Sequence, residues 1–167
     1  MRYRLDVVAP TVLDVVRYAG GWIYDRVMAG WDVTVLVANP DDLRPLHILG
    51  AQTLDLESVL EDWEARPHPQ TVAVAADLVD RDPRVLTHVR NALDQGATEV
   101  TLWGESLPAD LNDSVDSASH HLSAAARAFK SRALAAANAP DAGAVTASET
   151  FRCGLMASVA ADLVPAS

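Results

Sequence analysis

The chain has 167 residues, of which 50% are hydrophobic, and a formal net charge of −10 at pH 7. A domain of this size buries a sufficient core without disulfides, and no stretch approaches the roughly 20 apolar residues of a membrane-spanning helix. The acidic balance argues against nucleic-acid binding through a basic face, because neutralising phosphates requires clustered Lys and Arg.

Short runs rich in β-branched residues alternate with stretches of helical periodicity through the first two-thirds of the chain. The predicted strands are Leu5–Ala9, Asp32–Val37, Gln52–Leu56, Thr71–Ala75 and Thr98–Trp103. This alternation predicts a parallel sheet wrapped by helices. The run Thr71–Ala75 has no polar alternation, as expected of a strand that is covered on both faces.

A helix is predicted directly after the first strand. Thr11 can cap it, and apolar residues recur at helical spacing from Val12 to Val27. Gly20 and Gly21 lie inside this stripe, where each costs about 1 kcal/mol relative to alanine. We expect the close approach of the sheet, or of another helix, to explain the glycine pair.

Helix signals also separate the later strands. Short helices are predicted over residues 43–49 and after Ser58. Asp82 followed by Pro83 indicates the start of a longer helix, because proline suits the first helical position, and this helix runs to about Gln95.

The alternation ends near residue 110. The alanine-rich segment from about Asp113 to Asn138 predicts a helix with a thin apolar stripe. A last helix is predicted from Ser148 onward. Its apolar residues, at four-residue spacing, are Phe151, Leu155, Val159 and Leu163.

These elements predict an α/β fold, a three-layer sandwich with a mostly parallel, Rossmann-like sheet of about five strands. Residues 1–110 would form the sheet domain. Residues 111–167 would form a helical C-terminal extension that packs on this domain or on a second protomer. One antiparallel edge strand is the alternative. Such a sheet places a binding site at the carboxyl ends of its strands.

Hydroxyl, amide and carboxylate groups follow the predicted strands at this edge. The candidate ligand-binding residues are Thr11, Asn39, Asp41, Asp77, Glu105 and Ser106. Their carboxylates could hold Mg²⁺ or move protons, since hard cations take oxygen ligands and crowded carboxylates separate their pKa values. Helix capping is the competing interpretation of Asp41.

No motif in the sequence assigns catalysis. The segment Ala9–Thr11 lacks the glycines of a dinucleotide-binding turn, and Ser106 lacks the G-x-S-x-G turn of a hydrolase nucleophile. The histidines are dispersed along the chain and do not form a ligand motif. We therefore assign no catalytic residue and no metal ligand, and the cofactor stays unknown.

Cys153 is the single cysteine, so no disulfide can form within the chain. The opening MRYRLDVVAP has too short an apolar run for a secretory signal peptide. A lone cysteine without such a leader is typical of a reducing compartment. We therefore expect a cytoplasmic protein in which Cys153 is a small apolar side chain.

The apolar stripe near the C-terminus is the positive clue to function, because it needs a surface to bury against. We predict a non-enzymatic regulatory or scaffolding protein that acts by protein–protein contact, as a homodimer or with a protein partner, through the four residues of this stripe. The alternative is a small-ligand-binding protein or enzyme with an acidic site, which could use Mg²⁺, at the carboxyl ends of the strands.

Overall fold

The computed structural model describes residues 3–66, 68–95, 98–104, 115–154 and 164–165. The strands are β1 (Arg4–Thr11), β2 (Asp32–Asn39), β3 (Gln52–Asp55), β4 (Thr71–Ala75), β5 (Glu99–Trp103), β6 (Val115–His121), β7 (Ser148–Gly154) and β8 (Val164–Pro165). The helices are α1 (Val12–Met28), α2 (Arg44–Ile48), α3 (Leu56–Glu61), the 3-10 helix η1 (Trp63–Ala65), α4 (Ala76–Arg81), α5 (Pro83–Gln95) and α7 (Ala124–Ala136).

The described strands form one eight-stranded sheet in the order β3-β2-β1-β4-β5-β7-β6-β8. Neighbours among β1 to β5 pair in parallel, as predicted. β7 is antiparallel to both β5 and β6, and the short β8 is antiparallel to β6. The α/β class is therefore confirmed, but the sheet is mixed and larger than the mostly parallel, five-stranded sheet that the sequence predicts.

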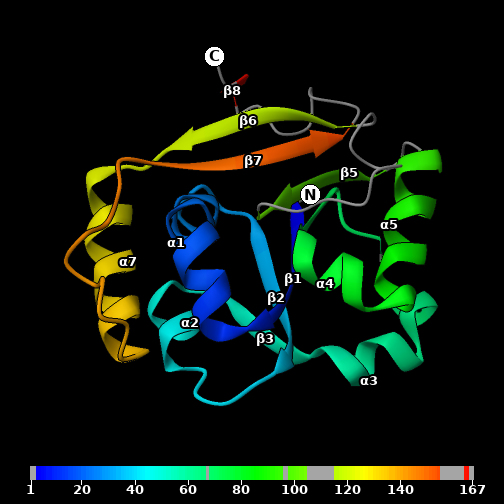
Figure 1. Ribbon diagram of the computed structural model, residues 1–167, viewed down its shortest axis with the longest axis horizontal. Helices are drawn as coiled ribbons and strands as arrows, with labels where there is room; N and C mark the ends of the chain where they lie inside the picture. The colour runs from blue at the N-terminus through cyan, green and yellow to red at the C-terminus, as the bar shows by residue number, and fades with distance from the viewer. Residues whose placement is uncertain (1–2, 67, 96–97, 105–114, 155–163, 166–167) are drawn as a thin grey trace.

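Helices cover both faces of this sheet. The chain moves from β1 to β2 in one direction and from β4 to β5 in the other, so right-handed crossovers place α1 and α5 on opposite faces. Figure 1 shows these helices on either side of β1. All five residues of β4 are buried, as its unbroken apolar run predicts. Among the described residues, no helix is long and apolar enough to cross a membrane.

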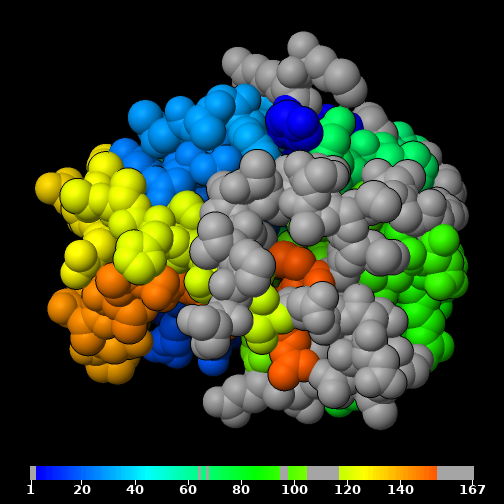
Figure 2. Space-filling model, turned by 90° about the horizontal axis from the view of Figure 1, so that it is seen from above, coloured from blue at the N-terminus to red at the C-terminus, as the bar shows by residue number. Residues whose placement is uncertain are grey.

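The described residues from 115 onward add three strands to the sheet, so the prediction of a purely helical extension is wrong, although α7 lies within the first predicted helix. The segment predicted as one helix from Asp113 contains β6 and then α7, and the helix predicted from Ser148 is β7. β6 and β7 form a long antiparallel pair (Figure 1). Figure 2 shows the yellow and orange residues of this part lying against the blue N-terminal part.

Phe151 illustrates this correction. It lies in β7 with 1% of its surface exposed, and its ring centroid is 5.0 Å from that of Trp22 in α1. A side chain in this position belongs to the core of its own chain and is not available to a partner surface. Leu155, Val159 and Leu163 lie outside the described residues. The homodimer remains a prediction.

A buried ion pair joins α7 and β7 to the middle of α1. The Lys130 Nζ lies 2.7 Å from the Glu149 Oε2, and the side chains are 5% and 2% exposed. Lys130 also donates to the Arg17 carbonyl oxygen at 2.7 Å. The Glu149 carboxylate accepts from the backbone N–H groups of Gly21, at 2.9 Å, and Trp22, at 2.7 Å. The buried ammonium and the buried carboxylate are therefore hydrogen-bonded to the α1 backbone as well as paired with each other.

Asp25 of α1 fixes the start of α7. Its carboxylate accepts from the Ser123 hydroxyl at 2.6 Å and lies 2.7 Å from the His120 Nε2. Although burial raises it, the hydrogen bonds from Ser123 and His120 hold the pKa of Asp25 below its ordinary value. The Ser123 hydroxyl in turn accepts from the Ala126 N–H and so caps α7.

Gly21 allows the chain to approach α1 closely at this point. An ideal Cβ placed on Gly21 would lie 2.1 Å from Leu122 Cδ2. The same atom placed on Gly20 would meet its nearest neighbour, Lys130 Cγ, at 3.4 Å. The glycine pair predicts that another part of the chain lies close to α1. That part is Leu122, between β6 and α7, and it lies close to Gly21.

Candidate functional site

The edge of the sheet where the parallel strands end begins with Thr11. Thr11 is both the last residue of β1 and the N-cap of α1, and its hydroxyl accepts from the Asp14 N–H at 3.1 Å. The strand therefore passes into the helix without a loop. This places Asp14, in the first turn of α1, directly over the carboxyl end of β1.

Asp14 is held by the last residue of β5. The indole Nε1–H of Trp103, which is 2% exposed, donates to the Asp14 Oδ2 at 3.2 Å. The Asp14 side chain is half-buried, and this burial raises its pKa above the ordinary aspartate value. The hydrogen bond from Trp103 opposes that shift, and the nearby charge of Asp77 adds to it.

Asp77 lies in the first turn of α4, at the carboxyl end of β4. Its exposed carboxylate forms an ion pair with Arg81, one turn further along the helix, at 3.1 Å. The charge of Asp77 raises the pKa of Asp14, and that of Arg81 lowers it. The ends of β1, β4 and β5 thus bring two carboxylates and one guanidinium into electrostatic contact.

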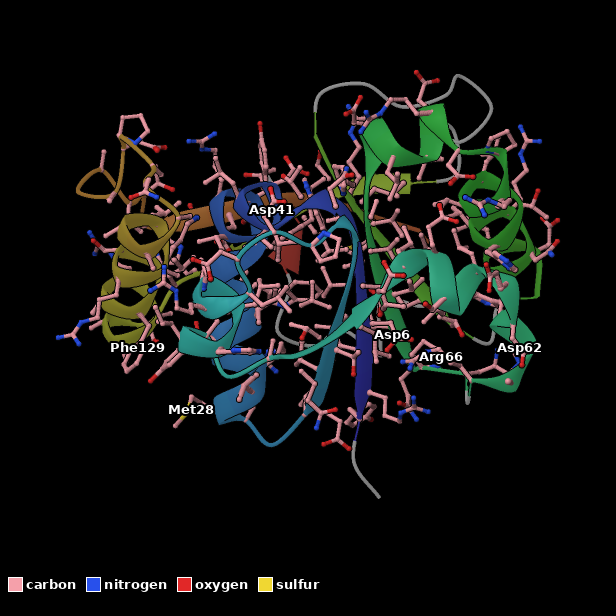
Figure 3. All side chains as sticks on the ribbon, turned by 90° about the horizontal axis from the view of Figure 1, so that it is seen from below. Asp6, Met28, Asp41, Asp62, Arg66 and Phe129 are labelled. Carbon is pink, nitrogen blue, oxygen red and sulfur yellow. The ribbon has the colours of Figure 1, made fainter. Side chains whose placement is uncertain are left out.

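Asn39 and Asp41 lie beyond β2. The Asn39 Nδ2 donates to the Pro10 carbonyl oxygen at 3.3 Å, which ties the end of β2 to the end of β1. The Asp41 side chain, labelled in Figure 3, is exposed. It is Asp42, not Asp41, that accepts the backbone N–H of Arg44 at the start of α2, at 3.0 Å.

The structure therefore gathers only part of the predicted site. Thr11, Asn39 and Asp77 lie at the ends of adjoining strands, around Asp14. Within the described ranges, no hydrogen bond or ion pair joins the Asp41 side chain to this group. Two further candidates, the glutamate and the serine that follow Gly104, lie outside the described residues.

Asp14 and Trp103 are the site residues that the sequence does not single out. An aspartate in the first helical turn has an ordinary interpretation, as part of a capping arrangement, and a tryptophan at the end of a strand is usually a packing residue. Only their positions could have identified them. Trp103 is the last residue of β5, and Asp14 lies just beyond the end of β1. The Trp103 N–H needs an acceptor once the ring is buried.

Metal binding has no complete ligand set in the described part of the chain. No three His, Cys, Asp or Glu side chains gather there as a metal site requires. Asp14 and Asp77 provide two carboxylates, and Asp77 is already paired with Arg81. We therefore derive no chemical step through a metal ion.

The fold is that of several solved deacetylases. The chain is similar to the A40926 pseudoaglycone deacetylase Dbv21, with a TM-score of 0.63 and 16% identity over 100% of this chain and 99% of that one. It is similar to the teicoplanin deacetylase Orf2 in its zinc-inhibited form, with a TM-score of 0.60 and 12% identity over 98% and 99% of the two chains. It is also similar to the deacetylase in a deacetylase–teicoplanin complex, with a TM-score of 0.61 and 14% identity over 91% of this chain and 98% of that one.

In sequence, no known family profile and no curated protein matches the chain. The structural likenesses, at 12–16% identity, establish the shared fold. These solved proteins are deacetylases, which contradicts the prediction of a non-enzymatic regulatory or scaffolding protein. The comparison agrees better with the alternative, a small-ligand-binding protein or enzyme.

Proposed function

We propose that this chain binds a small acylated amine at the carboxyl ends of its parallel strands, with the Asp14 carboxylate as the central acceptor. The observation that supports this most directly is the position of Asp14, half-buried at the end of β1 and oriented by the Trp103 indole. A fixed, partly desolvated carboxylate is suited to accept a hydrogen bond from an amide or amine N–H.

The shared fold supports the choice of ligand. The similar structures are those of deacetylases, which act on acetylated compounds. The raised pKa of Asp14 also makes this carboxylate a stronger base than a solvent-exposed aspartate. In hydrolysis it would take a proton from water while the water oxygen bonds to the carbonyl carbon, and return that proton to the nitrogen as the C–N bond breaks.

Replacing Asp14 with asparagine should weaken ligand binding at least ten-fold, about 1.4 kcal/mol, because the amide keeps the shape of the carboxylate but not its charge. N-acetylglucosamine and glucosamine are a suitable probe pair, since they differ only in the acetyl group. Binding is measured by calorimetry, and acetate release is followed in the same samples.

Asp41→Asn is the matched control, because Asp41 is exposed and lies outside the contacts around Asp14. It should bind the probes as the unmodified protein does. Equal affinities in all three proteins would contradict the proposal. Acetate released by the unmodified protein, but not by Asp14→Asn, would extend the proposal from binding to catalysis.

Ligand binding should also depend on pH through Asp14. Its pKa is raised in the folded protein, so the ionised acceptor is present above that pKa and is lost as the pH falls through it. We expect the affinity to fall on acidification, starting at a higher pH than an exposed aspartate would give. Calorimetry from pH 7 to pH 4 checks this, and a flat profile, or one identical in Asp14→Asn, would count against it.

A further inference from the structure

A cavity lies on the face of the sheet opposite α1. Its volume is about 150 Å³, and it lies between α5 and the strands β1 and β4. Val8, Val72 and Val74 form the side that belongs to the sheet, and Val85 and Val89 form the side that belongs to α5. These short side chains meet from both sides without filling the space between the two layers.

Two stacked rings line the cavity. The Trp63 ring of η1 and the His88 ring of α5 lie face to face, with centroids 4.2 Å apart and planes inclined by 16°. The stack connects the two elements across the cavity edge. Each ring covers one face of the other, so the stack offers a further ring its edges or a remaining outer face.

Polar groups line another part of the cavity. Asn91 of α5 contributes an exposed amide, and Thr98 contributes a hydroxyl that donates to the Pro69 carbonyl oxygen at 2.9 Å. Among the described lining residues there is no Asp, Glu, Lys or Arg. Together with the lining residues His68 and His88, these groups can hydrogen-bond a hydroxyl or a ring nitrogen, and the described lining offers no permanent charge to a charged ligand.

We infer that this cavity binds an uncharged, single-ring aromatic molecule with one polar substituent. The volume is similar to that of an engineered cavity of about 150 Å³ that binds benzene, so one ring fits this space, which unlike that apolar cavity is partly open and partly polar. The valine walls suit the apolar ring, and the Asn91 amide suits the substituent. A ligand of this class differs from the acylated amine proposed for Asp14, and the residues that line this cavity do not include Asp14, Asp77 or Trp103.

Phenol is the probe that tests this inference. Titration of the full chain with phenol should shift the methyl resonances of Val72, Val74 and Val89 in NMR spectra of valine-labelled protein. Phenol should also raise the melting temperature in a concentration-dependent manner, because it binds the folded state alone.

Ala92→Leu places three further carbons into the cavity from α5. It should weaken phenol binding at least ten-fold while leaving the circular dichroism spectrum unchanged. Ala128→Leu adds the same side chain to an exposed position of α7 and should leave phenol binding as it is. Ala92→Val is a smaller filler that can be used if the leucine variant does not fold.

The inference would be overturned by valine methyl groups that do not move with phenol. It would equally be overturned if the fillers at residue 92 and the control at residue 128 bind phenol alike, since the binding would then lie elsewhere. Charged analogues, such as benzoate and benzylamine, should bind at least ten-fold more weakly than phenol. Equal affinity for them would contradict the assignment of an uncharged ligand.

Discussion

Replacing Glu149 with leucine lowers the free energy of unfolding by about 3–5 kcal/mol, the cost of breaking a buried ion pair by removing one partner. The substitution leaves the Lys130 ammonium buried, at 5% exposure, without its carboxylate. It also removes the acceptor of the Gly21 and Trp22 N–H groups. Urea denaturation followed by circular dichroism measures the loss.

The combined change Lys130→Met with Glu149→Leu should recover the part of this loss that comes from the unpaired ammonium, since an apolar pair often replaces a buried ion pair without a net cost. The Gly21 and Trp22 N–H groups still lack the Glu149 acceptor. The control is the exposed pair between Glu57 and Arg84, where Glu57→Gln should cost far less than Glu149→Leu, because solvent screens this pair. If the double variant loses as much unfolding free energy as the sum of the losses in Lys130→Met and Glu149→Leu, the two side chains do not act as a pair.

Replacing Gly21 with alanine destabilises the protein by about 1–3 kcal/mol, although alanine is the better helix former by about 1 kcal/mol. The new Cβ would lie 2.1 Å from Leu122 Cδ2 and 2.3 Å from its Cγ, so the chain between β6 and α7 has to move. The same denaturation experiment measures the effect.

Gly20→Ala is the matched control, one residue earlier in the same helix. Its new Cβ would have no neighbour closer than 3.4 Å, so the helix propensity of alanine should leave stability equal or higher. Leu122→Ala added to Gly21→Ala should restore part of the loss. If Gly20→Ala and Gly21→Ala have the same effect, the contact with Leu122 is not what requires the glycine.

The parallel half of the fold could be predicted because its signals are local. β1 and β4 are short runs rich in apolar residues, each followed at once by a helix start, and the fold buries nearly all of their residues. Thr11 was predicted as a helix cap, and its hydroxyl accepts the Asp14 N–H as expected. In these elements the local preferences and the packed structure agree.

The antiparallel half could not be predicted because its stabilisation comes from distant residues. β6 reads VDSASHH, a sequence with little β preference, and it forms a strand through its pairing with β7 and β8. In β7, Glu149 and Phe151 share the buried face at a spacing of two. A glutamate at a core position conceals that alternation, since its burial depends on Lys130, which the sequence does not place nearby.

The positions of some candidate site residues could be predicted, but not their contacts. Parallel topology places Thr11 and Asp77 at the carboxyl ends of β1 and β4, where the structure has them. Their role in ligand binding stays a prediction. The contact between Asp14 and Trp103 joins residues 89 positions apart and depends on how β5 is seated beside β4. A pairing of this kind leaves no periodicity in the sequence.

Because β7 lies between β5 and β6, β6 can join the sheet only after β7 has been synthesised. β6 leaves the ribosome before β7, yet among the described strands it pairs only with β7 and β8. A nascent chain that ends at α7 therefore exposes the unpaired edge of β5, and β6 cannot cover it. Until β7 pairs with it, that edge presents unpaired backbone groups to which strands of other chains can add.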